Sequence, residues 1–240
     1  MLESVNNQRI RDYAKLNEKK YREEQGLFLV EGEHLVSEAL KKGCVKEIFL
    51  LKGETNPFGE VTFVTSEVLK KLTSLTNPPK VIAVCHKLPE GELIGNIIML
   101  DDINNPGNLG TIIRSAVAFN YETIILSPET VDVYNPKVIR ATEGMLFNVN
   151  IIISDLKTAL KTLEKSGYLI FGTDVKTGRE PEPLAKKHAL LIGSEAAGIK
   201  PEILSLCTQK LCLKMNPLCE SLNAGVSASI LMYELNKVRW

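Results

Sequence analysis

Short apolar runs alternate with helix-like segments through the second half of the chain, and this alternation limits the fold more than any other feature. The runs have the length and composition of buried strands and cover residues 97–100, 123–126, 149–153, 169–173 and 189–192. Segments with a helical pattern lie between them, as at residues 109–119 and 155–165. Strands that are separated by helices usually pair in parallel. The sequence therefore predicts an open, parallel α/β sheet for this half.

The N-terminal third shows the same alternation on a smaller scale. Strand-like runs cover residues 27–30, 47–51, 61–64 and 81–85. Basic side chains crowd residues 6–25, which predicts an exposed helix. A segment with Pro and Gly at residues 88–95 separates two apolar runs and reads as a linker. We therefore expect a small, largely parallel α/β domain at residues 1–90 and a second domain at residues 95–240.

Charge and cysteine usage exclude several classes of protein. Lys plus Arg number 29 and Asp plus Glu number 29, so a nucleic-acid site must be a local patch rather than a global charge. No apolar run is long enough to span a bilayer, and the N-terminus is polar. The five cysteines lack CxxC spacing, which favours reduced thiols over disulfides or zinc. These features predict a cytoplasmic protein without a membrane segment or a metal site.

Loops at the carboxyl ends of the predicted strands are the expected place for a ligand, because open α/β sheets bind ligands there. Four loops qualify, after Leu100, Phe171, Ile192 and Leu213. No GxGxxG or GxxxxGK(S/T) pattern follows a strand, so neither a dinucleotide site nor a P-loop is supported. Asn223 is placed to cap a final helix. The first residues of that helix, 224–229, are mostly small, which allows close approach of either a ligand or another helix.

Three short motifs occur in order along this second domain. The first is Asn108-Leu-Gly-Thr-Ile-Ile-Arg114, of the form NxGxxxR, in which Asn108 is also the expected helix cap. The second is Gly193-Ser-Glu195 after a predicted strand, and the third is Ser221-Leu-Asn223 at the start of the final helix. Each motif alone is weak, but the ordered set is specific.

With these motifs the chain resembles the SpoU (TrmH-like) family of RNA 2′-O-ribose methyltransferases, which belong to the knotted SPOUT class and use S-adenosylmethionine. Residues 29–40 look like part of the N-terminal substrate-binding domain of this family. The resemblance therefore covers nearly the whole chain. It implies an RNA-binding N-terminal domain and a C-terminal domain with a deep trefoil knot, in which the segment after Gly193 passes through an earlier loop.

The resemblance also implies roles for individual residues. The residue matching Arg114 is assigned in the family to deprotonating the 2′-hydroxyl. Arginine is effectively always protonated, so clamping an RNA phosphate and stabilising the forming alkoxide is the alternative role. The implied helpers, which position Arg114 and the ribose, are Asn108, Glu195, Ser221 and Asn223. The implied cofactor-binding residues are Gly193, whose backbone approaches the ligand, together with Leu213, Leu222, Met215 and Thr173.

RNA contacts are expected from basic side chains outside the cofactor loops. Arg140 lies in a segment that resembles an RNA-facing part of the family, although the neighbouring acid Glu143 is unexpected there. Arg9 and Arg11 belong to the basic N-terminal segment, which is either a solvated helix face or a phosphate-contacting arm. We expect no metal in the reaction, because methyl transfer to an alcohol needs only a held donor and an activated oxygen.

The family further implies a homodimer. The final helix carries apolar side chains at Val226, Ile230 and Tyr233, and an adjoining face carries Leu231, Leu235 and Val238. Such a broad stripe suits burial on two sides, either in a dimer or in the core of one chain.

These observations lead to one function and two alternatives. The sequence predicts an S-adenosylmethionine-dependent RNA 2′-O-methyltransferase, with ribosomal RNA of the 23S type as substrate. One alternative is a non-catalytic RNA-binding or ribosome-assembly protein that kept the fold, and the other is a tRNA 2′-O-methyltransferase. The intact motifs favour an enzyme, and the separate N-terminal domain favours ribosomal RNA, since compact tRNA enzymes of this branch typically lack it.

Overall fold

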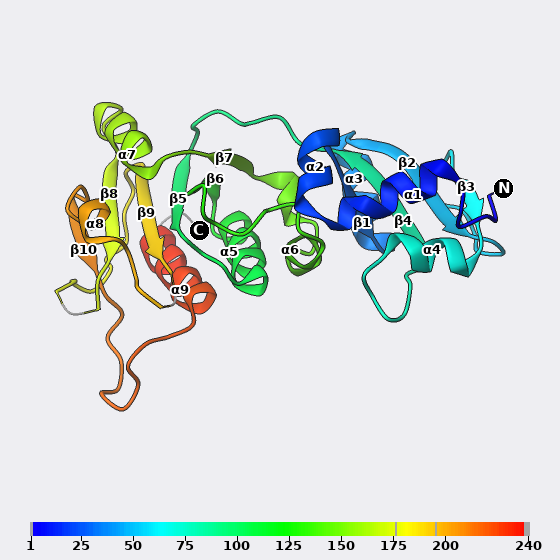
Figure 1. Cartoon of the computed structure of the whole chain (residues 1–240). Coiled ribbons are helices and arrows are strands. Elements are labelled where there is room, and N and C mark those ends of the chain that lie inside the picture. The colour runs from blue at the N-terminus through cyan, green and yellow to red at the C-terminus, as the bar shows by residue number, and fades with distance from the viewer. Residues whose placement is uncertain (1, 176, 195, 238–240) are drawn as a thin grey trace. The chain divides into compact units, whose positions relative to one another are not determined.

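A computed structural model describes residues 2–175, 177–194 and 196–237 of the chain (Figure 1). The chain divides into two compact units. The first combines Met1–Pro89 with Asp132–Phe147, and the second combines Glu90–Val131 with Asn148–Trp240. Residues 132–147 therefore pack with the N-terminal unit, although the expected limits place them in the second domain. The chain passes between the units at both ends of this segment.

The second unit is built on one sheet of parallel strands, as the sequence predicts. The strands are β5 (Asn96–Asp101), β6 (Tyr121–Leu126), β7 (Asn150–Ile153), β8 (Leu169–Thr173), β9 (His188–Gly193) and β10 (Gln209–Leu211). Their order is β10-β8-β9-β5-β6-β7, and every described pairing is parallel. The carboxyl ends of all these strands thus meet at one edge, which is where the loops that could bind a ligand must lie.

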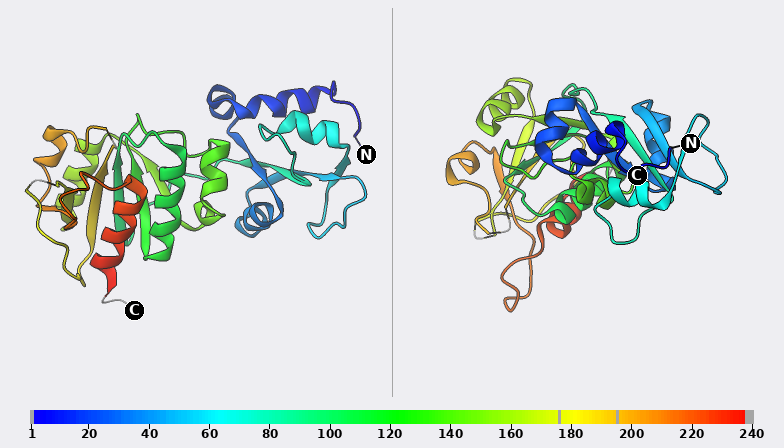
Figure 2. Two further views of the ribbon diagram at one scale, coloured as in Figure 1. Left: turned by 90° about the horizontal axis from the view of Figure 1, so that it is seen from below. Right: turned by 45° about the vertical axis from the view of Figure 1, so that its right-hand side comes forward.

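Helices cover both faces of this sheet (Figures 1 and 2). Side chains of α7 (Leu156–Lys165) and α8 (Pro201–Leu204) pack in one core cluster with Ile97 and Met99 of β5. Successive strand residues point to opposite faces, so Ile98 and Leu100 belong to the other face. Helices α5 (Pro106–Ala118) and α9 (Ala224–Asn236) lie side by side there and contact the sheet at β6 and β9.

The sheet of the first unit is not largely parallel, and this expectation was wrong. Its strands are β1 (Leu27–Glu31), β2 (Val45–Leu51), β3 (Thr62–Val64) and β4 (Val81–His86), in the order β1-β4-β2-β3. Strand β4 is antiparallel to both β1 and β2, whereas β2 and β3 are parallel. The alternation rule does hold for β1, β2 and β3, which run in the same direction. The last strand inserts between β1 and β2 and runs against both, which local sequence does not reveal.

The basic N-terminal segment also differs from the expected exposed helix. It forms α1 (Gln8–Ala14), a 3-10 turn at Lys15–Asn17, and α2 (Lys19–Gln25). Its apolar side chains Ile10, Tyr13 and Leu16 are buried in the core of the first unit. The other helices of this unit are α3 (Glu33–Lys42), α4 (Ser66–Leu72) and α6 (Pro136–Ala141), followed by a 3-10 turn at Met145–Asn148. The segment is therefore amphipathic, with only one solvated side.

Two ion pairs attach residues 132–147 to the rest of the first unit. The guanidinium of Arg22 is 2 % exposed and donates from Nε and Nη2 to Oδ2 of Asp132, at 2.8 and 2.6 Å. Arg140 Nη1 lies 2.8 Å from Oε2 of the buried Glu31. Aromatic contact between Phe28 and Tyr134 adds to these, with ring centroids 4.7 Å apart. A buried pair of this kind is strongly destabilising to break, because one charge is left without a partner.

Replacing Asp132 tests the buried pair. Asp132→Ala is expected to lower the free energy of unfolding of the first unit by about 3–5 kcal/mol, because the Arg22 charge stays buried without its carboxylate. Urea unfolding followed by circular dichroism measures this. The matched control is Glu3→Ala, which removes a pair with Lys52 in which both side chains are exposed and should leave the midpoint unchanged. Equal midpoints for the two variants would contradict the assignment.

Candidate functional site

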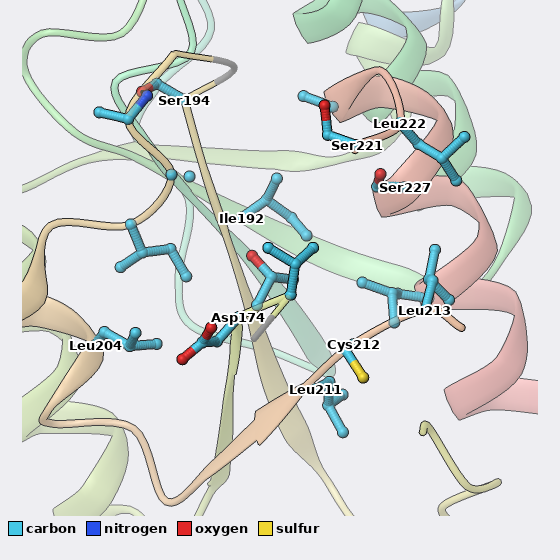
Figure 3. Close-up of a pocket in the computed structure, with 18 of the residues that line it drawn as sticks. Asp174, Ile192, Ser194, Leu204, Leu211, Cys212, Leu213, Ser221, Leu222 and Ser227 are labelled. Carbon is cyan, nitrogen blue, oxygen red and sulfur yellow. The ribbon is translucent and has the colours of Figure 1, made fainter. Parts of the chain in front are cut away.

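A pocket of about 570 Å³ lies at the carboxyl edge of the parallel sheet (Figure 3). It is lined by the loops after β8, β9 and β10 and by the first turns of α9. Figure 3 shows Ser221, Leu222 and Ser227 on one side, opposite Ser194 and Leu204. Three of the four loops expected to bind a ligand thus meet here, and the loop after β5 is not part of the lining.

All five residues expected to bind a cofactor line this one pocket. Thr173 ends β8, Gly193 ends β9, Leu213 and Met215 follow β10, and Leu222 precedes α9. Parallel pairing brings them together from distant parts of the sequence. The walls are mainly apolar, as expected for a site that holds a small organic ligand.

Gly193 has no room for a side chain, and the first reason lies in its own loop. A Cβ atom here would lie 2.1 Å from the carbonyl carbon of Gly198 and 2.2 Å from the nitrogen of Ile199. The loop folds back because Ser194 N–H donates to Gly198 O (3.2 Å) and Gly198 N–H donates to Ser194 O (2.9 Å). Gly198 adopts φ +68° at the turn, a conformation that favours glycine. The close approach at Gly193 is thus made by the chain itself, whereas the expectation from the sequence was that a ligand would make it.

The first and third motifs are joined by a hydrogen bond beside the pocket. Asn223 Nδ2 donates to Oδ1 of the buried Asn108 at 2.8 Å. Asn223 Oδ1 accepts from the N–H groups of Gly225 and Val226, so its prediction as the cap of the final helix is confirmed. The expectation that Asn108 caps its helix was wrong, because α5 begins earlier. Asn105 caps it by accepting from Gly107 N–H at 2.8 Å.

The small residues of α9 serve both functions that the sequence left open. A Cβ on Gly225 would lie 3.2 Å from the side chain of Thr111 on α5, and the hydroxyls of Ser115 and Ser229 are 2.7 Å apart. Close helix packing therefore uses one side of α9. Ala224 and Ser227 lie on another side and line the pocket.

The remaining residues with an expected catalytic role are placed differently. Ser221 lines the pocket. Arg114 is exposed on α5, is not among the lining residues and forms no ion pair with any residue that the structure describes. Glu195 lies outside the described residues. The structure thus brings Ser221 to the pocket and joins Asn108 to Asn223, while Arg114 stands apart from the pocket lining.

Two protein-family profiles match this chain and together show the family to which it belongs. The profile of the SpoU rRNA Methylase family matches residues 95–233, and that of the MRM3-like substrate binding domain matches residues 7–83. The chain belongs to the SpoU rRNA methylase family. The resemblance inferred from the three motifs and the N-terminal segment is thereby confirmed.

Proteins similar to this chain match it over nearly its whole length. The 23S rRNA (guanosine(2553)-2′-O)-methyltransferase RlmP of Bacillus subtilis is 34% identical over 98% of both chains. The AdoMet-bound rRNA methyltransferase from Sinorhizobium meliloti superposes with a TM-score of 0.88 at 26% identity, covering 100% of this chain and 98% of that one. The SpoU methyltransferase AviRb from Streptomyces viridochromogenes, in complex with AdoMet, gives 0.85 at 25% identity and covers 98% of both. The cofactor of this family member is therefore S-adenosylmethionine.

Asp174 is a pocket residue that sequence reasoning missed. It directly follows β8 and lines the pocket. Its Oδ2 accepts from Thr177 Oγ1 at 2.5 Å and lies 3.2 Å from Lys210 Nζ. An acid placed immediately after a predicted strand at the ligand-binding edge was the available signal. The carboxylate and the apolar walls together fit S-adenosylmethionine, which combines an apolar adenine ring with a positively charged sulfonium.

The cations expected to contact RNA are all in the first unit. Arg9 Nη1 lies 3.2 Å from Glu47 Oε1, and Arg140 is paired with Glu31. Arg11 is exposed. The unexpected acid Glu143 adopts φ +48°, and its carbonyl oxygen lies 3.2 Å from His34 Nε2. Two of the three arginines thus already have acidic partners within the unit.

The described part of the chain contains neither a metal-binding cluster nor a membrane-spanning helix. Within residues 2–175, 177–194 and 196–237, no group of three or more His, Cys, Asp or Glu side chains could hold a metal ion. Over the same residues, no helix has the length and apolar character needed to cross a membrane.

Substitution of Gly193 tests the β9 loop as part of the cofactor site. Gly193→Val is expected to weaken S-adenosylmethionine binding by about tenfold or more, because the new side chain displaces Gly198 and Ile199. Titration calorimetry measures the affinity. Ala196→Val is the matched control, since Ala196 is exposed in the same loop and does not line the pocket. Undiminished affinity in Gly193→Val would refute the placement of the cofactor.

Proposed function

We propose that this chain transfers a methyl group from S-adenosylmethionine to the 2′-hydroxyl of a ribose in ribosomal RNA, of the 23S type. The observation that carries the proposal is the convergence of all three family motifs at or beside one pocket in a chain of the SpoU family. The Bacillus subtilis relative, which is named for this activity on 23S rRNA, supports the substrate class. Such a substrate places the enzyme in the cytoplasm.

The cofactor is held by the loops that line the pocket. Leu213, Met215 and Leu222 provide apolar walls for the adenine, while Thr173 and the backbone of Gly193 complete the lining. When bound, S-adenosylmethionine supplies a methyl group on a positively charged sulfur. The apolar walls exclude water, and Asp174 places a carboxylate in a pocket that must accept this positive charge.

Arg114 acts on the RNA rather than on the cofactor. Its exposed side chain is outside the pocket lining, so it is free to meet a phosphate and the reacting ribose. A fixed guanidinium binds phosphate through two N–H groups and stabilises a developing alkoxide, whereas a protonated arginine is a poor base. The proton of the 2′-hydroxyl passes to water as the methyl–oxygen bond forms and the methyl–sulfur bond breaks, which leaves the sulfur neutral. Asn108, Asn223 and Ser221, together with Glu195, orient the ribose and Arg114.

RNA is bound by the first unit. The match of residues 7–83 to a substrate-binding domain supports this division of labour between domains 1–90 and 95–240. Arg11 is exposed and ready for phosphate contact, whereas Arg9 and Arg140 keep their pairs with Glu47 and Glu31 and offer their remaining N–H groups to RNA phosphates. Such contacts release counterions, so affinity falls with salt concentration.

The proposed enzyme is a knotted homodimer, as the family resemblance implies. Support for the dimer comes from α9, where Val226, Ile230 and Tyr233 are exposed. The second apolar face of α9 packs in the core of this chain, where Leu231 and Leu235 are buried, so it does not contribute to a dimer surface. Val238 lies outside the described residues. The trefoil knot, with the segment after Gly193 threaded through an earlier loop, is the chain path that we propose for the parallel sheet.

Removing the Arg114 guanidinium tests the proposed chemistry. Arg114→Ala is expected to slow methyl transfer by about a hundred- to thousandfold, because one preorganised charge at the forming alkoxide is lost. Cofactor affinity should stay close to that of the parent, since Arg114 does not line the pocket. Single-turnover transfer at saturating S-adenosylmethionine measures the rate, and calorimetry measures the affinity.

Two further variants complete this test. Arg114→Lys should restore only part of the rate, because an ammonium cannot clamp a phosphate through two parallel hydrogen bonds. Lys161→Ala removes an exposed cation on α7 and should leave the rate unchanged. A rate within a few-fold of the parent in Arg114→Ala would mean that Arg114 has no role in the chemistry.

The exposed face of α9 gives a test of the dimer. Ile230→Lys is expected to convert a dimer into a monomer, because a charge is placed in an apolar interface. Light scattering after gel filtration measures the mass. Ile153→Lys is the matched control, since Ile153 is an exposed isoleucine on the edge strand β7. A parent protein that is monomeric, or an Ile230→Lys protein that stays dimeric, would contradict the proposal.

A further inference from the structure

We propose that Asp101 and Lys200 form a positioning pair that holds the β9 loop closed over Gly193 and thereby sets the affinity for S-adenosylmethionine. The inference rests on the proposed function of the pocket as the cofactor site. Neither residue lines the pocket, and neither belongs to the three motifs. The pair acts through the loop that follows β9.

Asp101 lies at the centre of the sheet, at the edge where the pocket opens. It is the last residue of β5 and the register partner of Gly193 in the β5–β9 pairing. Its side chain is 2 % exposed. A carboxylate this deeply buried is costly unless it is paired and hydrogen-bonded.

Lys200 supplies both of the interactions that Asp101 needs. The backbone N–H of Lys200 donates to Asp101 Oδ2 at 3.0 Å, and its ammonium lies 3.4 Å from Oδ1. Oδ1 has no hydrogen bond to any described group, so the ammonium is its partner by charge. The Asp101 carboxylate in turn raises the pKa of Lys200, with Glu129 and Asp102 adding to the effect. The ammonium therefore stays charged at neutral pH.

The pair closes a loop whose other end is fixed by the sheet. Gly193 is held in β9, the chain folds back through the Ser194–Gly198 bridge, and Lys200 is tied to β5 through Asp101. This loop lines the pocket with Ser194, Ala197, Gly198 and Ile199, and Pro201 lines it directly after Lys200. Glu195 of the second motif lies in the same loop by sequence. Releasing the Lys200 end would free this whole wall of the pocket.

A positioning role and a purely structural role predict different results. If the pair only stabilises the fold, its loss lowers the unfolding midpoint and leaves cofactor affinity unchanged. If it positions the loop, the loop must be ordered at the moment of binding, so affinity falls even in a folded protein. The KM for S-adenosylmethionine should then rise while kcat at saturating cofactor changes little, because bound cofactor restores the closed loop.

Two conservative substitutions separate the interactions, in the full-length chain. Lys200→Met removes the ammonium and keeps the backbone N–H, and Lys200 is partly exposed so that the change should be tolerated. Asp101→Asn keeps an acceptor for that N–H and removes the charge. Each is expected to weaken S-adenosylmethionine binding roughly tenfold by calorimetry. The double variant should be no weaker than either single one, because both remove the same pair.

The control is Lys80→Met, which breaks a lysine–carboxylate pair with Glu54 in the first unit and should leave cofactor affinity unchanged. Hydrogen exchange of residues 194–199 without cofactor gives a readout of the loop alone and should accelerate in Lys200→Met. Unchanged affinity and unchanged exchange in folded Lys200→Met would overturn the inference. A parent protein that binds no S-adenosylmethionine would overturn the proposed function instead, and the loop anchoring would then be judged by exchange.

Discussion

Parallel pairing of β10, β8, β9 and β5 is the constraint on which the site depends. It aligns the carboxyl ends of four strands at one edge, so that the loops after β8, β9 and β10 meet in one pocket and β5 ends beside it. The β5–β9 register then sets Asp101 directly beside Gly193. The result is a pocket whose lining residues are far apart in sequence but fixed by backbone hydrogen bonds. A one-residue slip would turn every strand side chain to the other face and dismantle this edge.

Much of the second unit could be predicted, because the sequence patterns that specify its strands and loops are local. Short apolar runs separated by helices specify parallel strands, and the loops after them are the natural place for a ligand. Asn223 was recognisable as a cap because its side-chain oxygen can accept from the first N–H groups of a helix, and the structure shows it accepting from Gly225 and Val226. The five expected cofactor residues were inferred from the family resemblance, and the parallel sheet explains why they converge. Asp174 belongs to none of the three motifs, and its position directly after β8 is the sequence signal that could have identified it as a pocket residue.

Most of the errors concern partners that lie far away in the sequence. Insertion of β4 between β1 and β2 makes the first sheet mainly antiparallel, although each local strand was recognisable. Arg22 reads as a surface cation in a basic segment, yet it is buried because Asp132 supplies a carboxylate from more than a hundred residues away. Residues 132–147 join the first unit through such long-range contacts, so no change of composition marks their place in it. The cap of α5 is a local exception. The helix begins at Pro106, which is well suited to the first helical position, so Asn105 caps it instead of Asn108.

Helix α9 shows how one element can couple the separate parts of the site. Its residues divide by helical spacing into three faces. Ala224, Ser227 and Leu231 line the pocket, Gly225 and Ser229 contact α5, and Val226, Ile230 and Tyr233 are exposed. A helix is stiff, so a shift of any one face moves the others. The Asn223–Asn108 bond fixes where α9 begins relative to α5, the helix that carries Arg114. The pocket, the proposed catalytic Arg114 and the proposed dimer surface are therefore held to one another by a single capped helix.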